Sequence, residues 1–204
     1  MKKLQLIYIL FLALITFSSC KETIKKENKP TEKNYVIEAK STIINWTAYK
    51  TTNKVPVKGK FNSVTIESAK TASTITEALD GLKFNIPVSS IFTKDTVRDT
   101  KLKKFFFGSM NNTETISGTL AIINKTTGAV TLTMNGISHD LPITFTIKDQ
   151  TVTIESLMDL DNWKAQLALQ ALNAACKDLH SGEDGIPKTW NEVKIEVSTN
   201  LKYQ

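Results

Sequence analysis

The sequence has 204 residues, a formal net charge of +6 and 41% hydrophobic residues. These totals predict one folded domain with appendages and exclude a chain that is disordered throughout. Two cysteines are too few for a disulfide framework. The basic residues are scattered and have no interleaved surface aromatics, so we do not expect a nucleic-acid partner.

Residues 1–19 have the pattern of a secretory signal that ends just before Cys20. Two lysines precede an apolar stretch that is too short to span a membrane, and two serines stand directly before the cysteine. This pattern resembles the lipobox of bacterial lipoproteins, which implies acylation of Cys20 and anchoring in a bacterial envelope membrane, facing the periplasm or the cell surface. The alternative is a plain secretory signal that happens to contain a cysteine. Residues 20–33 follow as the lipidated cysteine and a flexible charged linker.

Residues 34–204 form the predicted folded domain, and apolar and polar residues alternate through most of it, as in β-strands. The clearest run is 115–148, in which turns at Thr127-Gly128 and Asn135-Gly136 join three strands. In the third strand of the domain, the apolar positions change from odd to even near Asn62-Ser63, which predicts a β-bulge. The remaining alternating runs are Tyr35–Ile37, Ile44–Tyr49, Leu82–Val88, Val152–Ser156 and Val193–Val197.

Three segments interrupt the strand pattern. Residues 76–80 and 94–108 have short helical spacing, and 162–179 is predicted to be one amphipathic helix with Asp161 as its N-cap. This helix lies within a helical insert around 162–188. With eight or nine strands and few helices, the pattern predicts an all-β fold that closes into a barrel or packs on a second sheet.

Three pairs of short motifs occur in order over about residues 35–200. They are Trp46–Lys50 with Val57–Phe61, Val88–Phe92 with Arg98–Leu102, and Leu132–Ile137 with Leu141–Thr144. These motifs resemble the signatures of the YceI-like family. The resemblance implies an extended, lipocalin-like antiparallel barrel of eight strands whose interior binds a long amphipathic lipid, polyisoprenoids in the best-known cases.

The resemblance also implies a periplasmic protein, and since some members are dimeric it leaves a homodimer open. The sequence departs from the family pattern in two places. Lys101 stands where the R-D-x-H-L motif has histidine, and the insert around 162–188 is longer than the pattern requires. The insert could cover the barrel mouth or an exposed edge.

The candidate ligand-binding residues are mostly large apolar side chains at inward positions. They are Phe61, Val64, Phe84, Ile86, Leu132, Met134, Phe145 and Trp163. The alternative is that these side chains simply fill the interior, because a barrel of about eight strands can do either. Arg98 is the candidate for binding a phosphate or carboxylate head group, with Lys101, Lys103 and Lys104 adding positive potential. Alternatively, Asp99 caps a short helix and Arg98 is a surface or structural residue.

Signals for catalysis or metal binding are weak. No nucleophile elbow or paired-carboxylate spacing occurs, and Cys176 and His180, one helical turn apart, are too few for a zinc site. We therefore expect a non-catalytic protein, without cofactor or metal, that binds an amphipathic lipid for storage, transport or stress protection. The alternatives are a packed barrel that contacts a protein partner through its outer surface and an enzyme that acts on a bound lipid or quinone.

Overall fold

The computed structural model describes residues 34–204, so the predicted signal segment, Cys20 and the linker lie outside the described residues. The described part forms one antiparallel sheet in the order β3-β4-β6-β7-β8-β9-β10-β1-β2-β5. Its strands are β1 (Tyr35–Lys50), β2 (Val55–Phe61), β3 (Thr65–Ile66), β4 (Lys83–Pro87), β5 (Ile91–Phe92), β6 (Thr115–Ile122), β7 (Thr127–Met134), β8 (Ile137–Lys148), β9 (Thr151–Asp159) and β10 (Thr189–Tyr203).

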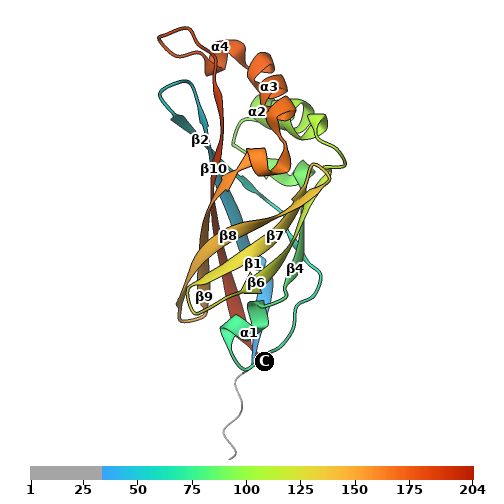
Figure 1. Ribbon diagram of the computed structural model, residues 1–204. Coiled ribbons are helices and arrows are strands. Elements are labelled where there is room, and N and C mark those ends of the chain that lie inside the picture. The colour runs from blue at the N-terminus through green and yellow to red at the C-terminus, as the bar shows by residue number, and fades with distance from the viewer. Residues whose placement is uncertain (1–33) are drawn as a thin grey trace, which may run out of the picture. The chain divides into compact units, whose positions relative to one another are not determined.

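The sheet curls round on itself (Figure 1). β1 pairs with β10, so the first and last strands are neighbours. The two ends of the strand order also meet, because β2 pairs with β5 at Phe61↔Ile91 and β3 pairs with β4 at Thr65↔Asn85. β2 and β3 are consecutive pieces of one chain segment, as are β4 and β5. The predicted all-β antiparallel fold is confirmed, with ten strand segments in place of eight or nine strands.

The change of inward parity near Asn62-Ser63 is also confirmed. Phe61 in β2 and Val64 just before β3 both face the interior, although their numbers differ in parity. An interruption between two strands produces the change, rather than a bulge within one strand. The Asn62 amide still donates to the Ser90 carbonyl at 2.9 Å, so the pairing continues up to the break.

The turns of the central meander match the prediction in one case only. Asn135 and Gly136 have φ angles of 53° and 67°, and this pair of positive values is the type I′ hairpin geometry. The predicted turn at Thr127-Gly128 is wrong, because both residues belong to β7. The turn lies before them, where the Asn124 side chain accepts hydrogen bonds from the amides of Thr126 and Thr127, each at 2.9 Å.

Helices lie at both ends of the curled sheet (Figure 1). α1 (Ile75–Leu79) lies at the end where β1 begins and β10 ends, and a capping box of Thr74 and Glu77 fixes its start. α2 (Thr96–Lys101) continues into a π-helical turn (Leu102–Phe106) near the other end, beside α3 (Gln166–Ala175), which α4 (Lys177–His180) follows. The predicted helical character of 76–80 and 94–108 is therefore confirmed.

The single helix predicted at 162–179 is wrong. A 3₁₀ turn (Leu160–Trp163) comes first, Lys164 adopts a left-handed conformation, and α3 (Gln166–Ala175) and α4 (Lys177–His180) follow as separate helices. Asp161 is not an N-cap, because Asp159 accepts the hydrogen bond that caps the 3₁₀ turn. The left-handed residue and the break at Cys176 let the insert bend over the end of the sheet.

Two glycines on the inner face of the sheet accommodate aromatic rings of neighbouring strands. Gly59 is paired with Trp46, and Gly118 is paired with Phe84. A Cβ atom at either glycine would collide with the facing ring. The rings therefore lie across the backbone of the adjacent strand instead of projecting into the interior, which leaves space in the middle of the sheet.

Replacing Gly59 with alanine is expected to destabilise the domain. The new methyl group would overlap the Trp46 indole, and forced overpacking of this kind costs about 1–3 kcal/mol. Urea unfolding would measure the loss. The same Gly59→Ala change in a Trp46→Ala background should cost much less, and an equal cost in both backgrounds would contradict this account.

Candidate functional site: an apolar cavity inside the sheet

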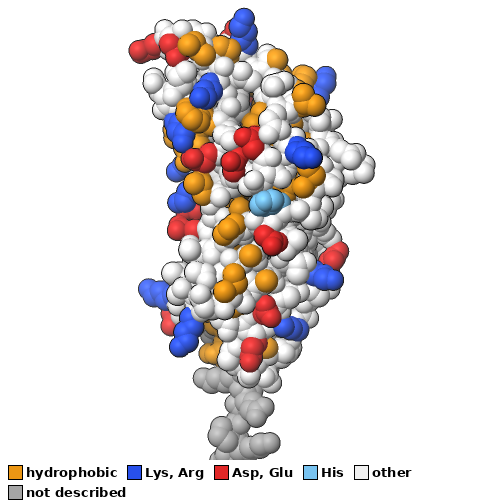
Figure 2. All heavy atoms as spheres, in the orientation of Figure 1, with side chains coloured by type: hydrophobic (Ala, Val, Ile, Leu, Met, Phe, Trp, Pro, Cys, Tyr) orange, Lys and Arg blue, Asp and Glu red, His pale blue; other side chains and the backbone are white. Residues whose placement is uncertain are grey.

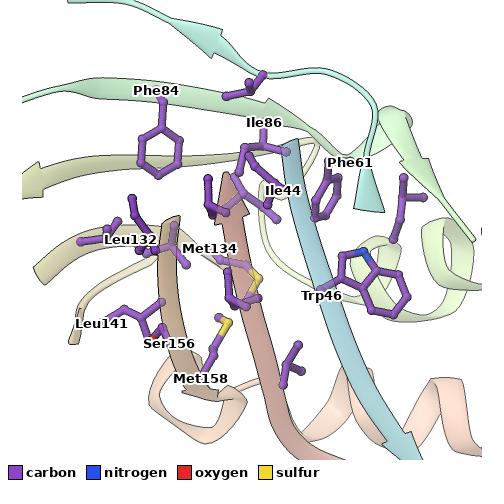
Figure 3. A pocket seen from close by; sticks show the side chains of 18 of the residues that line it. Ile44, Trp46, Phe61, Phe84, Ile86, Leu132, Met134, Leu141, Ser156 and Met158 are labelled. Atoms are coloured by element: carbon purple, nitrogen blue, oxygen red, sulfur yellow. The ribbon is translucent and has the colours of Figure 1, made fainter. Parts of the chain in front are cut away.

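The curled sheet encloses a cavity of about 220 Å³ (Figure 3). Side chains from all ten strands of residues 34–204 line it, together with residues of the helical segments at its two ends. Engineered cavities of about 150 Å³ with aliphatic and aromatic walls stay dry and take up benzene. The cavity in this domain is larger than those, so it has room for a sizeable apolar guest.

The wall of the cavity is almost entirely hydrocarbon. Among the lining residues, all of which fall within 34–204, there is no Asp, Glu, Lys, Arg or His. The hydroxyl groups on the wall have partners inside the protein. Thr42 and Thr199 bond to each other at 2.7 Å, and Ser156 donates to the Pro142 carbonyl at 2.6 Å. Thr189 donates to the Asn173 side chain at 3.0 Å.

Six of the predicted ligand-binding residues lie together on this wall. They are Phe61, Val64, Phe84, Ile86, Leu132 and Met134. Sequence reasoning omitted other lining residues, and these divide into two kinds. Trp46 lies on a strand whose alternation already placed it inward, so the pattern contained its signal. Leu169 and Leu172 reach the cavity because α3 docks over the end of the sheet, which strand periodicity cannot predict.

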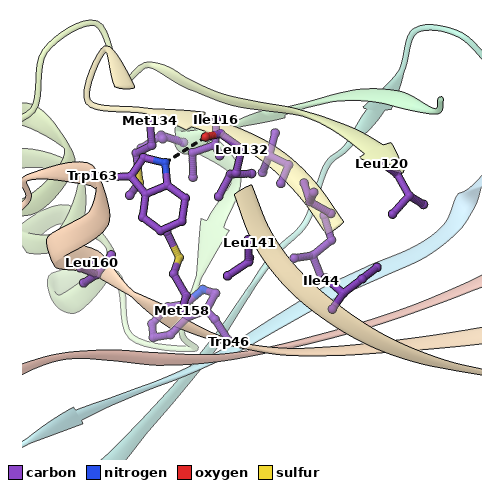
Figure 4. Close-up of a cluster of buried hydrophobic side chains, with 14 of the residues drawn as sticks. Ile44, Trp46, Ile116, Leu120, Leu132, Met134, Leu141, Met158, Leu160 and Trp163 are labelled. Carbon is purple, nitrogen blue, oxygen red and sulfur yellow. Dashed lines mark hydrogen bonds between the residues drawn. The ribbon is translucent and has the colours of Figure 1, made fainter. Parts of the chain in front are cut away.

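Phe145 and Trp163 do not line the cavity, although both are buried, at 3% and 0% exposure. Trp163 belongs to the 3₁₀ turn of the insert, and its Nε1 donates to the Leu132 carbonyl at 2.9 Å (Figure 4). This bond fixes the insert to β7. Phe145 packs in the core on β8, near the hairpin that leads to β9. The structure therefore gives these two side chains a packing role.

Arg98 also lies away from the cavity wall. Its guanidinium is 3.4 Å from the Asp95 carboxylate, and both side chains are 44% exposed. Asp95 caps α2 by accepting from the Arg98 amide at 3.0 Å. Asp99, which the alternative interpretation made the cap, is instead buried and accepts from the Thr93 amide and hydroxyl at 2.9 and 2.7 Å. Arg98 is not among the residues that line the cavity, so a head-group role for it stays a prediction.

Two lysines attach the insert to the rest of the domain. Lys101 Nζ donates to the Ala175 carbonyl at the end of α3, at 3.0 Å, and Lys50 Nζ donates to the Leu179 carbonyl in α4, at 2.8 Å. The last carbonyls of a helix lack partners within the helix, and lysine side chains can supply them. Leu169 and Leu172 are thereby held over the cavity.

His180 lies in a chain of hydrogen bonds beside these lysines. The Asn173 amide donates to the Pro187 carbonyl at 3.1 Å, which leaves its oxygen to accept from the Thr189 hydroxyl. That hydroxyl must then accept from His180 Nδ1, at 2.7 Å, so the proton of the neutral imidazole is on Nδ1. Burial, and then the charges of Lys50 and Lys101, lower the pKa of His180 to about 4.

Other kinds of site find no support in the described part of the chain. Residues 34–204 contain no group of three or more His, Cys, Asp or Glu arranged to hold a metal ion. Cys176 is a buried free cysteine. Within the same range, no helix is both long enough and apolar enough to cross a membrane. On the face seen in Figure 2, basic and acidic side chains are interspersed, so that face is not a continuous basic surface.

The curled antiparallel sheet and its apolar cavity define the class of small β-barrel proteins with a hydrophobic interior. The chain belongs to the YceI-like family, because the model of the YceI-like domain matches residues 35–201. A search of curated proteins finds no match.

Two solved structures share the fold. A polyisoprenoid binding domain from Saccharophagus degradans, implicated in plant cell wall breakdown, is 12% identical, with a TM-score of 0.59 over 83% of this chain and 98% of that one. BcnA of Burkholderia cenocepacia is 15% identical, with a TM-score of 0.51 over 81% and 99% of the two chains. At sequence identities of 12% and 15%, these similarities establish a shared fold and nothing more.

The lowered pKa of His180 predicts acid sensitivity. The folded state binds this proton less readily than the unfolded state does, so the stability that the neutral imidazole contributes is complete above about pH 6.5 and declines as the pH falls toward 4. Thermal unfolding measured across this range should show a smaller decline for His180→Gln than for the wild type. His139→Gln removes the other histidine as a control, and an equal change in both variants would contradict the assignment.

Proposed function

We propose that this protein is a non-catalytic lipoprotein of the bacterial envelope whose barrel holds one long amphipathic lipid, isoprenoid or fatty-acid-like, for storage, transport or stress protection. The observation that carries the proposal is the cavity of about 220 Å³, whose wall within residues 34–204 has no ionisable side chain. Membership of the YceI-like family supports it, as does the shared fold with a domain described as polyisoprenoid-binding.

Burial alone can provide the affinity of such a site. Each buried CH₂ group contributes about 0.8 kcal/mol, so ten contribute about 8 kcal/mol before the costs of ordering the ligand. Micromolar affinity corresponds to a net binding free energy of about 8 kcal/mol, so the bound chain must bury more than ten such groups to offset those costs. The wall therefore favours a long apolar chain without needing a charged contact.

The alternative function is an interaction module with a packed barrel that contacts a protein partner through its outer surface. That reading requires a filled interior, and the cavity favours the lipid-binding proposal over it. An enzyme would need a group with a shifted pKa beside the bound lipid. His180, whose pKa is strongly lowered, is engaged by Thr189 and is not a lining residue.

Native mass spectrometry of residues 21–204 tests the proposal directly. We expect an adduct of several hundred daltons, and organic extraction should identify it as a molecule with a long apolar chain. A mass equal to that of the protein alone, together with no uptake of added isoprenoid or fatty-acid-like lipids, would contradict the proposal and favour the packed module.

Two neighbouring residues on opposite faces of β9 provide a matched pair of variants. Met158 lines the cavity, whereas Leu157 is 61% exposed on the outside. Met158→Trp should occupy part of the cavity and reduce lipid uptake about tenfold or more, the equivalent of two excluded CH₂ groups. Leu157→Trp should leave uptake unchanged. Competition with a fluorescent fatty acid measures both, and equal effects would show that the lipid does not bind inside.

The proposed membrane anchor depends on Cys20. Cys20→Ser is expected to abolish incorporation of labelled palmitate and to move the protein from the membrane fraction to the soluble fraction. Cys176→Ser is the control, because it removes the other cysteine, which is buried in the domain. Membrane attachment that survives Cys20→Ser would contradict the lipoprotein assignment.

A further inference from the structure

The three tryptophans of this chain differ in how their indole nitrogens are satisfied. Trp163 Nε1 donates to the Leu132 carbonyl at 2.9 Å, and Trp190 Nε1 donates to the Thr51 carbonyl at 2.7 Å. Trp46 Nε1 is buried and has no acceptor among residues 34–204. The Thr51 hydroxyl is the other buried side-chain polar atom without a partner in that range, but Thr51 does not line the cavity.

In the protein without a bound ligand, the unpartnered nitrogen of Trp46 has a cost in free energy. Trp46 is only 7% exposed, and a buried N–H group that has given up its hydrogen bonds to water costs free energy unless an acceptor replaces them. Phenylalanine could cover the same wall without this cost. An unsatisfied donor in a native structure calls for an explanation, and here the donor belongs to a side chain of the cavity wall.

The indole has a fixed place on that wall (Figure 3). Trp46 is paired with Gly59 on one side and with Ile195 on the other, and its ring lies across the Gly59 backbone. The nitrogen is buried, so a guest reaches it only when neighbouring atoms of the protein move. Met134 and Met158 stand on the same wall, and methionine changes rotamer at low cost.

We propose that Trp46 Nε1 donates a hydrogen bond to an oxygen atom of the bound lipid, and that the ligand is therefore a long-chain lipid with a neutral carbonyl, ether or hydroxyl oxygen rather than a plain hydrocarbon. This inference rests on the proposed lipid-binding function and specifies the chemistry of the ligand. A neutral oxygen fits better than an anionic one, because the wall offers no cation to compensate a buried charge.

The test compares three compounds of fifteen carbons. Two are ketones, one with the carbonyl at the second carbon and one with it at the middle carbon, and the third is the plain alkane. Each compound competes with a fluorescent fatty acid for binding to the protein comprising residues 21–204. The competition is measured for the wild type, Trp46→Phe and Trp190→Phe. We expect the preference for the better ketone over the alkane to fall about tenfold in Trp46→Phe, since a hydrogen bond is worth about that factor. Trp190 lines the same cavity with a satisfied nitrogen, so Trp190→Phe should leave the preference unchanged.

The indole N–H signals in a ¹H–¹⁵N spectrum give a second readout that does not depend on affinity. The signal that is missing from Trp46→Phe identifies Trp46, and it should move downfield with the ketone but not with the alkane. An unchanged ketone preference in Trp46→Phe, or a Trp46 signal that responds equally to both probes, would overturn this inference. If the wild type takes up neither probe nor the fluorescent fatty acid, the proposed lipid-binding function itself is overturned.

Discussion

The pairing of β1 with β10 is the contact on which the rest of the structure depends. It runs from Tyr35↔Tyr203 to Lys50↔Thr189 and joins the two ends of the domain. Without it the sheet would have two long exposed edges and no enclosed interior. This pairing joins residues far apart in the sequence, so forming it carries the entropy cost of closing a long loop. The cavity is therefore a property of the completed sheet and of no single segment.

Closure alone would not keep the interior open, since buried apolar side chains tend to fill the space available to them. Gly59 and Gly118 counter this by letting the facing rings of Trp46 and Phe84 lie against the sheet. Unfilled space forfeits dispersion contacts and lowers stability. A guest with a long apolar chain would restore those contacts, so the same arrangement that weakens the protein alone strengthens its complex. This is the trade between stability and function that binding sites commonly show.

Alternation along the strands predicted much of the fold and six residues of the cavity wall, because parity alone decides which side chains point inward. It could not separate the wall from the surrounding core, and Phe145 is buried without reaching the cavity. The turn at Asn124 was missed because a side-chain hydrogen bond replaces the expected glycine. The lowered pKa of His180 depends on tertiary structure that no local pattern encodes, because burial causes it first and the charges of Lys50 and Lys101 add to it. The docking of the insert likewise depends on distant partners, since Lys101 and Lys50 donate to carbonyls of its helices.

The two departures from the YceI-like pattern are physically connected. Lys101 stands where the R-D-x-H-L motif that the sequence resembles has histidine, and its ammonium group bonds to the Ala175 carbonyl at the end of α3, within the insert. A lysine side chain is longer than a histidine side chain and has three donors on a flexible stem, which suits a helix C-terminus whose carbonyls lack partners. A histidine would have neither that reach nor a permanent charge at neutral pH to favour the negative end of the helix. Lys101 and the insert thus form one arrangement, in which α3 is held over the end of the cavity.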